Sequence, residues 1–235
     1  HCLSSAASDV YKRQDIMSMK THAKKDGSDW ILNGSKHFIS GPVMPDFAIV
    51  FAATGEDETP RGKRKRITAF LVDVGENGFE IGIGTKCVSY RGYHAFRLNF
   101  SDVRLGPNQI LGEEGKGLEL SGKWLGMGRI WVGASCCGKA ERLFGLAKDW
   151  ASTRKQFGQP IGKFQATGFK LADIAIELRA ADLMVNDAVR RANEGKMTDA
   201  DAAMVKVYCS EMLNRAADNT PVSYTHLRAH ETVSH

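Results

Sequence analysis

The chain has 235 residues, a formal net charge of +5, 43% hydrophobic residues and 25% charged residues, which is an ordinary globular composition with enough apolar residues for a core. It contains no apolar run of roughly 18 residues, so no membrane span is expected, and so small a charge does not call for nucleic acid. Five cysteines, two of them adjacent, do not resemble a disulfide framework and predict apolar core residues in a reducing, cytoplasmic compartment.

Both ends of the chain look foreign. Residues 1–14 lack usable periodicity and the features of a signal peptide, and Pro221 is expected to stop a helical pattern. Residues 1–14 and 221–235 resemble translated sequencing-adapter sequence, which predicts a natural segment of 15–220 truncated on both sides. The alternative is a pair of disordered natural termini. Four of the seven histidines lie in these tails, so the histidine count predicts no metal site.

From residue 15 to about 112 the pattern is that of β-structure. Apolar and polar residues alternate from Met17 to Ala23, and Asn33-Gly34 is a strong hairpin-turn signal after Trp30. Six or seven short strands separated by turn residues predict a compact antiparallel sandwich or barrel. The further strands are expected near residues 36–39, 46–53, 67–72, 79–83 and 96–100.

After the boundary at residues 106–117 the period changes to that of helices. One long helix is expected from 117 to 153, and glycines within it would allow close approach of a neighbouring helix. Two further helices follow a turn-rich corner and a turn at 193–195, which predicts an incomplete antiparallel bundle over residues 113–220. The fold class is therefore α+β. The expected core positions are Leu171, Ile174, Leu178, Ala181, Val185 and Ala188, then Ala202, Val205, Cys209, Met212 and Ala216.

Several familiar sites have no supporting motif. The sequence lacks a Gly-rich dinucleotide fingerprint and a P-loop, so it does not predict either of these nucleotide sites. It also lacks paired C-x-x-C and H-E-x-x-H motifs, so no metal ligands are predicted. The basic run Arg61–Arg66 is interpreted as a solvated hairpin tip. A phosphate-steering patch is a weaker alternative, and a nucleic-acid patch is weaker still because no aromatic residues interleave with the charges.

The most informative stretch is the corner at residues 154–165. Arg154 offers a planar donor fork suited to a pyrophosphate, Phe157 offers a flat face for a ring, and Gln165 can both donate and accept hydrogen bonds. From the residues alone, this is a helix-loop-helix corner with anion-binding potential.

The same corner resembles the R-x-x-F-G-x-x-I-x-x-F-Q motif of the acyl-CoA dehydrogenase family, in which it holds FAD. The stretch from Asn33 to Gly41 resembles a second motif of that family, N-G-x-K-x-x-I-[ST]-x-G, and residues 92–117 resemble a third. The resemblance implies that Phe38, Ile39 and Ser40 lie against the flavin. It also implies that Arg154, Phe157 and Gln165 hold the FAD of a neighbouring subunit, so a homo-oligomer, a tetramer in most of the family, is expected.

The family's substrate and base positions are only partly present. Arg129 matches an arginine that contacts acyl-CoA, whereas Gly126 replaces the usual aspartate. Gly128 occupies the position at which one branch carries its catalytic glutamate, and the main branch's base would lie beyond residue 220. No catalytic residue is therefore assigned within this chain.

The resemblance implies a fragment of an FAD-dependent acyl-CoA dehydrogenase, which desaturates an acyl-CoA thioester in fatty acid metabolism and passes electrons to an acceptor like an electron-transfer flavoprotein. The chain itself is expected to be inactive. Two alternatives stay open: a flavin oxidase or monooxygenase on the same scaffold, and a non-catalytic helical binding protein.

Overall fold

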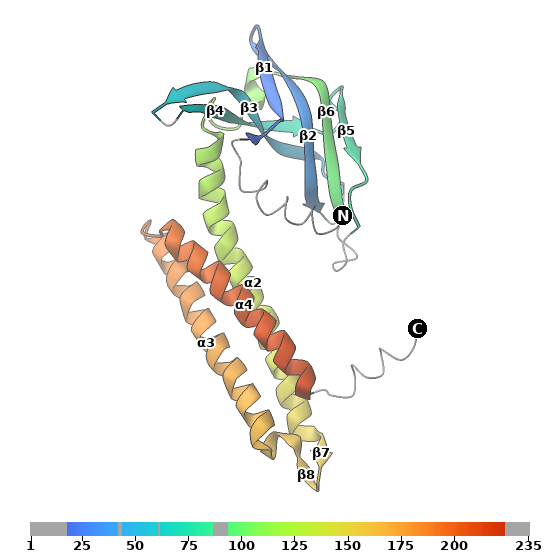
Figure 1. Cartoon of the computed structure of the whole chain (residues 1–235), viewed down its shortest axis with the longest axis vertical. Helices are drawn as coiled ribbons and strands as arrows, with labels where there is room; N and C mark the ends of the chain where they lie inside the picture. Colours follow the sequence, from blue (N-terminus) through green and yellow to red (C-terminus); the bar gives the residue numbers. More distant parts are fainter. Residues whose placement is uncertain (1–17, 42–43, 61, 87–93, 224–235) are drawn as a thin grey trace. The chain divides into compact units, whose positions relative to one another are not determined.

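The computed structural model describes residues 18–41, 44–60, 62–86 and 94–223, apart from the side chains of 221–223. It divides into two compact units, one ending at Gly122 and one beginning at Lys123. Strands make up the first unit and long helices the second, as Figure 1 shows. The predicted α+β class is confirmed.

The first unit is one six-stranded sheet that curves into a half-barrel (Figure 1). The strand order is β4-β3-β1-β2-β6-β5, and neighbours pair antiparallel except β1 and β3, which run parallel through His22 and Ala53. The sheet is thus mixed at one position where an all-antiparallel arrangement was expected. The strands are β1 (His22–Asp26), β2 (Asp29–Gly41), β3 (Phe47–Thr59), β4 (Gly62–Asp73), β5 (Phe79–Gly82) and β6 (His94–Leu105).

One apolar cluster forms the core of this sheet. Alternate residues of each strand point inward, as the two-residue period of a strand requires. Phe70 is completely buried and meets the ring of Trp30 edge-on at 5.9 Å between centroids. The other large members are Leu32, Val50, Val72, Phe96, Leu98, Phe100, Val103 and Leu105. The 3₁₀ helix η2 (Pro107–Gln109) follows β6, and Leu111 then donates its N–H to the carbonyl of Ala69 at 2.8 Å.

The hairpin predicted at Asn33-Gly34 is wrong. The turn lies between β1 and β2 at Gly27, whose φ is +63°, and Asn33 and Gly34 lie within β2 at a break in its register with β6. The Asn33 amide donates to the Asp102 carboxylate, and its oxygen accepts from the Asp102 N–H, both at 2.9 Å. Asn33 therefore joins two strands instead of forming a turn.

Gly34 is required by a close backbone approach. Its φ is +131°, and a Cβ there would lie 2.7 Å from the Cα of Thr21, which is buried. We expect Gly34→Ala to lower the free energy of unfolding by about 1–3 kcal/mol, because backbone must move. Gly138→Ala, at an exposed helical position with nothing within 4 Å, is the matched control and should be neutral or stabilising. Urea unfolding that shows equal stability for both variants would contradict this prediction.

The basic run is mostly strand and not loop. Residues 62–66 belong to β4 and lie opposite an acidic segment of β3, while Arg61 falls outside the described residues. Arg66 forms an ion pair with Asp57 and a second, at 3.9 Å, with Glu114. Neighbouring β3 charges therefore balance the run, which argues against a nucleic-acid surface. The opposed pairs are Glu56 with Lys65, Asp57 with Arg64 and Glu58 with Lys63.

The second unit contains most of α2 (Gly117–Thr153), all of α3 (Gln165–Asn193) and all of α4 (Asp199–Ser223). Between α2 and α3 come the two-residue strands β7 (Lys155–Gln156) and β8 (Gln159–Pro160) and the 3₁₀ helix η3 (Ile161–Lys163). The predicted long helix at 117–153 is confirmed. All five core positions predicted in α4 are buried, whereas in α3 Leu171 and Leu178 are only half-buried.

Small residues allow the three helices to pack closely. A Cβ on Gly133 of α2 would lie 2.5 Å from Cγ1 of Val205 on α4, so the predicted close approach is confirmed there. The predicted close approach is wrong for Gly128, Gly138 and Gly145, which have open space around them. The thiols of Cys136, Cys137 and Cys209 are buried, as predicted for core cysteines.

The expectations for the two ends are tested only in part. Residues 1–14 and 224–235 lie outside the described residues. The helix α4 continues to Ser223, so Pro221 does not stop it at residue 220 as expected. A proline inside a helix removes one hydrogen bond and crowds the preceding turn at a cost of about 3 kcal/mol, so it disfavours a further turn without forbidding one. In the described residues, no helix has the length and apolar character needed to cross a membrane.

Candidate functional site

In the β unit, the candidate site is the irregular stretch of β2 around Phe38. The register between β2 and β6 shifts between Lys36 and Ile39, so the strand bulges outward at Phe38. Phe38 has φ +58°, which is unusual for a bulky residue, and its ring is 44% exposed. The backbone thus presents an aromatic face to solvent at a conformational cost of about 1–3 kcal/mol.

Ile39 and Ser40 frame this aromatic residue. The Ile39 side chain is half-buried and packs against the sheet core, which fixes the strand beyond the bulge. Ser40 is exposed and its hydroxyl donates to the carbonyl of Phe38 at 3.3 Å. A single long hydrogen bond leaves this hydroxyl free to turn toward a ligand. The three residues predicted to meet the flavin are thus consecutive on one bulged strand.

Lys36, which precedes the bulge, is a residue to which no sequence motif assigned a role. Burial lowers the pKa of its ammonium group to about 8, and none of the described carboxylates forms an ion pair with it. A perturbed lysine beside a candidate ligand surface is a common feature of functional sites. Lys36 matches the lysine of the N-G-x-K motif, and that match was the signal available in the sequence.

We expect Lys36→Met to raise the free energy of unfolding at pH 7 by about 1–3 kcal/mol, because it removes the cost of burying a charge. Between about pH 8 and 10.5 the unfolded chain binds more protons than the folded one, so the stability of the parent rises with pH in this range. The difference in free energy of unfolding between Lys36→Met and the parent therefore shrinks as the pH rises. Urea unfolding at pH 7 and at pH 10 measures this, with the exposed Lys24→Met as control. A difference that grows with pH would contradict the prediction.

In the helical unit, the candidate site is the corner between α2 and α3. Phe157 and Gly158 form a two-residue turn joining β7 to β8, with φ of +50° and +79°. A turn of this type normally places Asn or Asp at the first position. Phe157 occupies it with a side chain that is 94% exposed and touches Phe164 only edge-on, at 6.1 Å between centroids. A strained, exposed aromatic ring is suited to contact with a ligand or another chain.

Arg154 and Gln165 lie on either side of this turn. The Arg154 backbone is fixed by hydrogen bonds to Trp150 and Ile161, each 2.8 Å long, while its guanidinium lies 6.0 Å from the Trp150 ring centroid. Gln165 is exposed in the first turn of α3, whose N-terminus has no side-chain cap and no acidic residue. The free N–H groups and the helix dipole favour an anion there. The corner therefore combines an aromatic face with donors for a phosphate.

Arg129, the predicted substrate contact, lies on α2 apart from this corner. Its side chain is half-buried and follows two glycines, of which Gly126 packs against Met197 at 3.3 Å from its virtual Cβ. Gly128 has nothing within 4 Å, so this surface is open beside the arginine. Neither glycine can transfer a proton, and the described residues contain no cluster of metal ligands.

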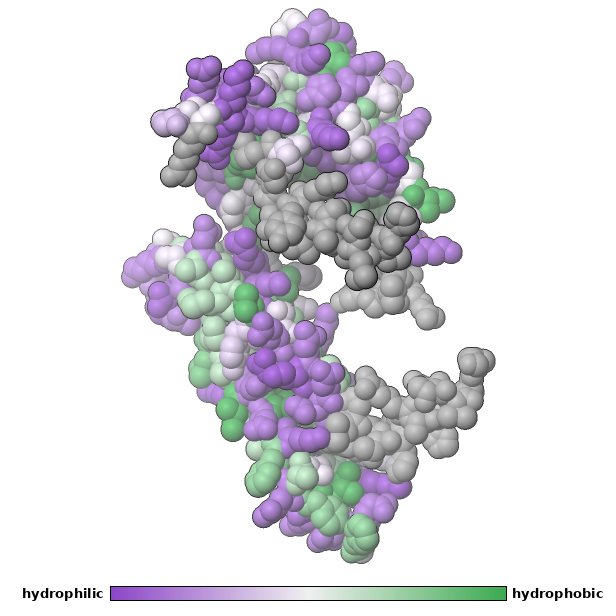
Figure 2. Space-filling model, in the orientation of Figure 1, coloured by the Kyte–Doolittle hydropathy of each residue, from purple (hydrophilic) through white to green (hydrophobic). Residues whose placement is uncertain are grey.

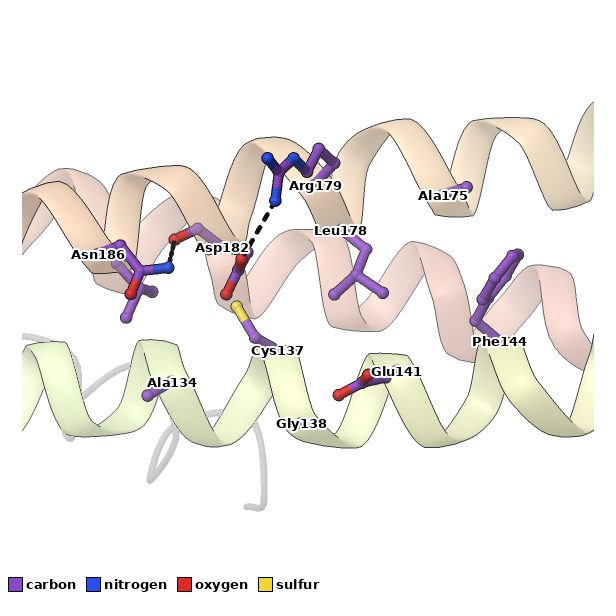
Figure 3. A pocket seen from close by; sticks show the side chains of 11 residues that line it. Ala134, Cys137, Gly138, Glu141, Phe144, Ala175, Leu178, Arg179, Asp182 and Asn186 are labelled. Carbon is purple, nitrogen blue, oxygen red and sulfur yellow. Dashed lines mark hydrogen bonds and ion pairs between the residues drawn. The ribbon is translucent and has the colours of Figure 1, made fainter.

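A separate groove of about 550 Å³ lies between α2 and α3 (Figure 3). Cys137 and Leu178 form part of its floor, and Asp182 pairs with Arg179 at 3.7 Å at its rim. Burial raises the pKa of the Cys137 thiol, so this thiol stays protonated and is a weak nucleophile. None of the predicted flavin or substrate residues lines this groove, so we do not assign the site to it.

The profile of the acyl-CoA dehydrogenase middle domain matches residues 4–103, and that of the acyl-CoA dehydrogenase C-terminal domain matches residues 115–221. The chain belongs to the acyl-CoA dehydrogenase family. Two curated relatives are a 3-(aryl)acrylate reductase of Clostridium sporogenes, 36% identical over 84% of this chain, and a short-chain specific acyl-CoA dehydrogenase of Megasphaera elsdenii, 37% identical over 82%. The chain spans 51% and 49% of their lengths.

Solved structures agree with this family assignment. Butyryl-CoA dehydrogenase from Megasphaera elsdenii superposes with a TM-score of 0.83 and 34% identity, covering 91% of this chain and 55% of that one. A structure described as an electron transferring flavoprotein of Acidaminococcus fermentans gives a TM-score of 0.81 and 33% identity, with 91% and 55% covered. This member of the family thus has the fold of about half of each of these solved proteins.

Proposed function

We propose that this chain is part of an FAD-dependent acyl-CoA dehydrogenase and supplies its flavin-contacting surfaces. One observation carries the proposal. Three non-glycine residues among the described positions have positive φ, and two of them, Phe38 and Phe157, are predicted flavin contacts. The third, Asp102, is explained by its hydrogen bonds to Asn33. Strain of this kind persists where function requires it.

In this proposal each residue has a physical role. Bound FAD supplies the hydride acceptor, a chemistry that belongs to the cofactor. Phe38 forms an apolar wall for the ring system, Ile39 anchors the bulged strand beside it to the sheet core, and the Ser40 hydroxyl donates a hydrogen bond to the polar edge of the ring system. On the corner, Arg154 donates to the pyrophosphate, Phe157 covers an aromatic ring and Gln165 donates or accepts at its edge. Arg129 binds an acyl-CoA group, and this chain supplies no general base.

The wider setting is also a proposal. The substrate is an acyl-CoA thioester, and the electron acceptor resembles an electron-transfer flavoprotein, in keeping with the description of one structural neighbour. Because the corner residues serve the FAD of a neighbouring subunit, the protein works as a homo-oligomer, which we propose is a tetramer. We also propose that the protein works in the cytoplasm. We propose residues 15–112 as the middle domain and 113–220 as part of the C-terminal domain.

Titration of the purified chain with FAD and, separately, with riboflavin tests this function. We expect saturable quenching of flavin fluorescence with FAD and weaker binding of riboflavin, because riboflavin lacks the pyrophosphate that Arg154 contacts. Acyl-CoA added with an artificial electron acceptor should not be turned over. Absence of any saturable FAD binding, or steady turnover by the chain alone, would contradict the proposal.

A flavin oxidase or monooxygenase on the same scaffold is the alternative that the sequence leaves open. The flavin contacts would be identical, so the rate at which reduced flavin in the intact protein reacts with oxygen separates the two activities. A non-catalytic helical binding protein is a poorer fit, because it gives no reason to keep two strained aromatic residues.

A further inference from the structure

Two cysteines from different helices meet inside the helical unit. The surface of this unit mixes polar and apolar residues (Figure 2), whereas Cys137 of α2 and Cys209 of α4 are buried in one apolar cluster. Both are free thiols, and their side chains form a hydrogen bond with each other. They are distant in the sequence, so the packing of α2 against α4 is what brings them together.

A glycine on α2 allows this contact. Gly133 lies one helical turn before Cys137, on the same face of the helix. A Cβ on Gly133 would lie 3.5 Å from Sγ of Cys209, in addition to its clash with Val205. The absence of a side chain at Gly133 therefore lets α4 come close to α2 beside the two cysteines. A disulfide requires such an approach, because its two Cα atoms lie only about 4.4–6.8 Å apart.

The two thiols differ in their access to solvent. Cys137 forms part of the floor of the groove between α2 and α3, and Figure 3 shows its sulfur pointing away from the α2 ribbon. Cys209 is not among the residues that line this groove and is completely buried. Burial raises the pKa of the Cys209 thiol to about 12, so Cys209 is a poor first nucleophile. A reagent in the groove would therefore meet Cys137 first.

We infer that Cys137 and Cys209 are a redox-sensitive pair that closes to a disulfide between α2 and α4 when a small organic disulfide enters the groove. The Cys137 sulfur attacks one sulfur of the small disulfide, which forms a mixed disulfide and releases one thiolate. The Cys209 sulfur then attacks Sγ of Cys137 and releases the second thiolate. Each cysteine gives its proton to a released thiolate. The pair thus loses two electrons, and the small disulfide is reduced to two thiols.

Closure of the pair braces the helical unit. The new bond closes a loop of about 70 residues, which contains all of α3 and the corner between α2 and α3. Such a link restricts the unfolded chain, so we expect the thermal unfolding midpoint of the helical unit to rise by about 10 °C. Excess reducing thiol reverses the exchange and should restore the original midpoint. A closed chain that unfolds at the midpoint of the reduced chain would refute this bracing.

Reaction with dipyridyl disulfide tests the pair, because each pyridine thiol that it releases absorbs light and can be counted. The test uses the full-length chain carrying Cys2→Ser, Cys87→Ser and Cys136→Ser. We expect release of two pyridine thiols per chain, and a product that is lighter by two hydrogen atoms and carries no pyridine group. A product that keeps its pyridine groups, or a folded chain that does not react, would overturn the inference.

Two variants in the same background test the order of attack, with circular dichroism to show that each is folded. Cys209→Ala should stop at the mixed disulfide and keep one pyridine group. Cys137→Ala should react at least about tenfold more slowly than the parent, because the remaining thiol is completely buried. Equal rates for Cys137→Ala and the parent would contradict access through the groove.

The neighbouring cysteine supplies the matched control. A chain that keeps Cys136 and carries Cys137→Ala should form no disulfide with Cys209, although both of its thiols are buried in the same cluster. Formation of that disulfide would mean that Cys137 is not the specific partner. None of these measurements involves flavin, so the inference is tested independently of the proposed function.

Discussion

Arg154→Ala should weaken FAD binding about 10–100-fold, the loss expected for a charge-assisted hydrogen bond of about 1.5–3 kcal/mol. The Arg154 backbone is fixed by two hydrogen bonds, whereas its guanidinium lies 6.0 Å from the centroid of the Trp150 ring, so removing the side chain should leave the corner folded. Fluorescence titration with FAD measures the dissociation constant, and riboflavin binding should change little because riboflavin has no pyrophosphate.

Two variants control this prediction. Lys155→Ala removes an exposed positive charge from the next residue, in β7, and should change FAD affinity much less than Arg154→Ala does. Arg154→Lys keeps the charge but loses the planar fork, so we expect an intermediate affinity. Equal losses for Arg154→Ala and Lys155→Ala would mean that the corner attracts FAD only through its overall charge.

The helical half could be predicted closely because each helix carries a strong local signal. A buried stripe at helical spacing identifies the core, and in α4 it identified Ala202, Val205 and Met212 correctly. In α3 the same reasoning found the buried face, but it gave no sign that Phe169, Ile176 and Leu183 would be more than half exposed. A helix with apolar residues on two faces has no single period that tells its buried positions from its exposed ones.

The β half was harder because strand pairing is not local. Asn33-Gly34 and Asp26-Gly27 both favour a tight turn, and sequence alone does not decide between them. Asn33 is held in the strand by Asp102, which is distant in the chain, and Gly34 is required by contact with Thr21. The basic run in β4 was hard to interpret for the same reason, because the acidic partners of its residues lie across the hairpin on β3.

The candidate site lies between these two cases. Motifs identified Phe38 and Phe157 by residue type and spacing, but their positive φ values could be seen only in the structure. The low pKa of Lys36 was equally hidden, because it depends on how deeply the bulged strand buries the ammonium group. Residue type thus predicts what a site can bind, while the structure shows the backbone strain and the buried charge that accompany the site.

Phe70→Ala should destabilise the β unit by about 3–5 kcal/mol, the cost of removing a fully buried aromatic side chain and leaving a cavity. Phe70 sits among Trp30 and Val50 in a core made only of strand residues, while the helical unit has a separate core. The damage should therefore stay within the first unit. Hydrogen exchange followed by mass spectrometry should show lost protection in the strands and retained protection in α3 and α4.

The matched control is the next residue along β4. Leu71 is 37% exposed on the opposite face, so Leu71→Ala should cost well under half as much as Phe70→Ala. Because Ser40 and the strained Phe38 depend on the β2–β6 pairing that this core supports, Phe70→Ala should also abolish FAD binding while Leu71→Ala preserves it. If exchange protection fell equally in both units, their two cores would be one cooperative structure and the argument for separate stability would fail.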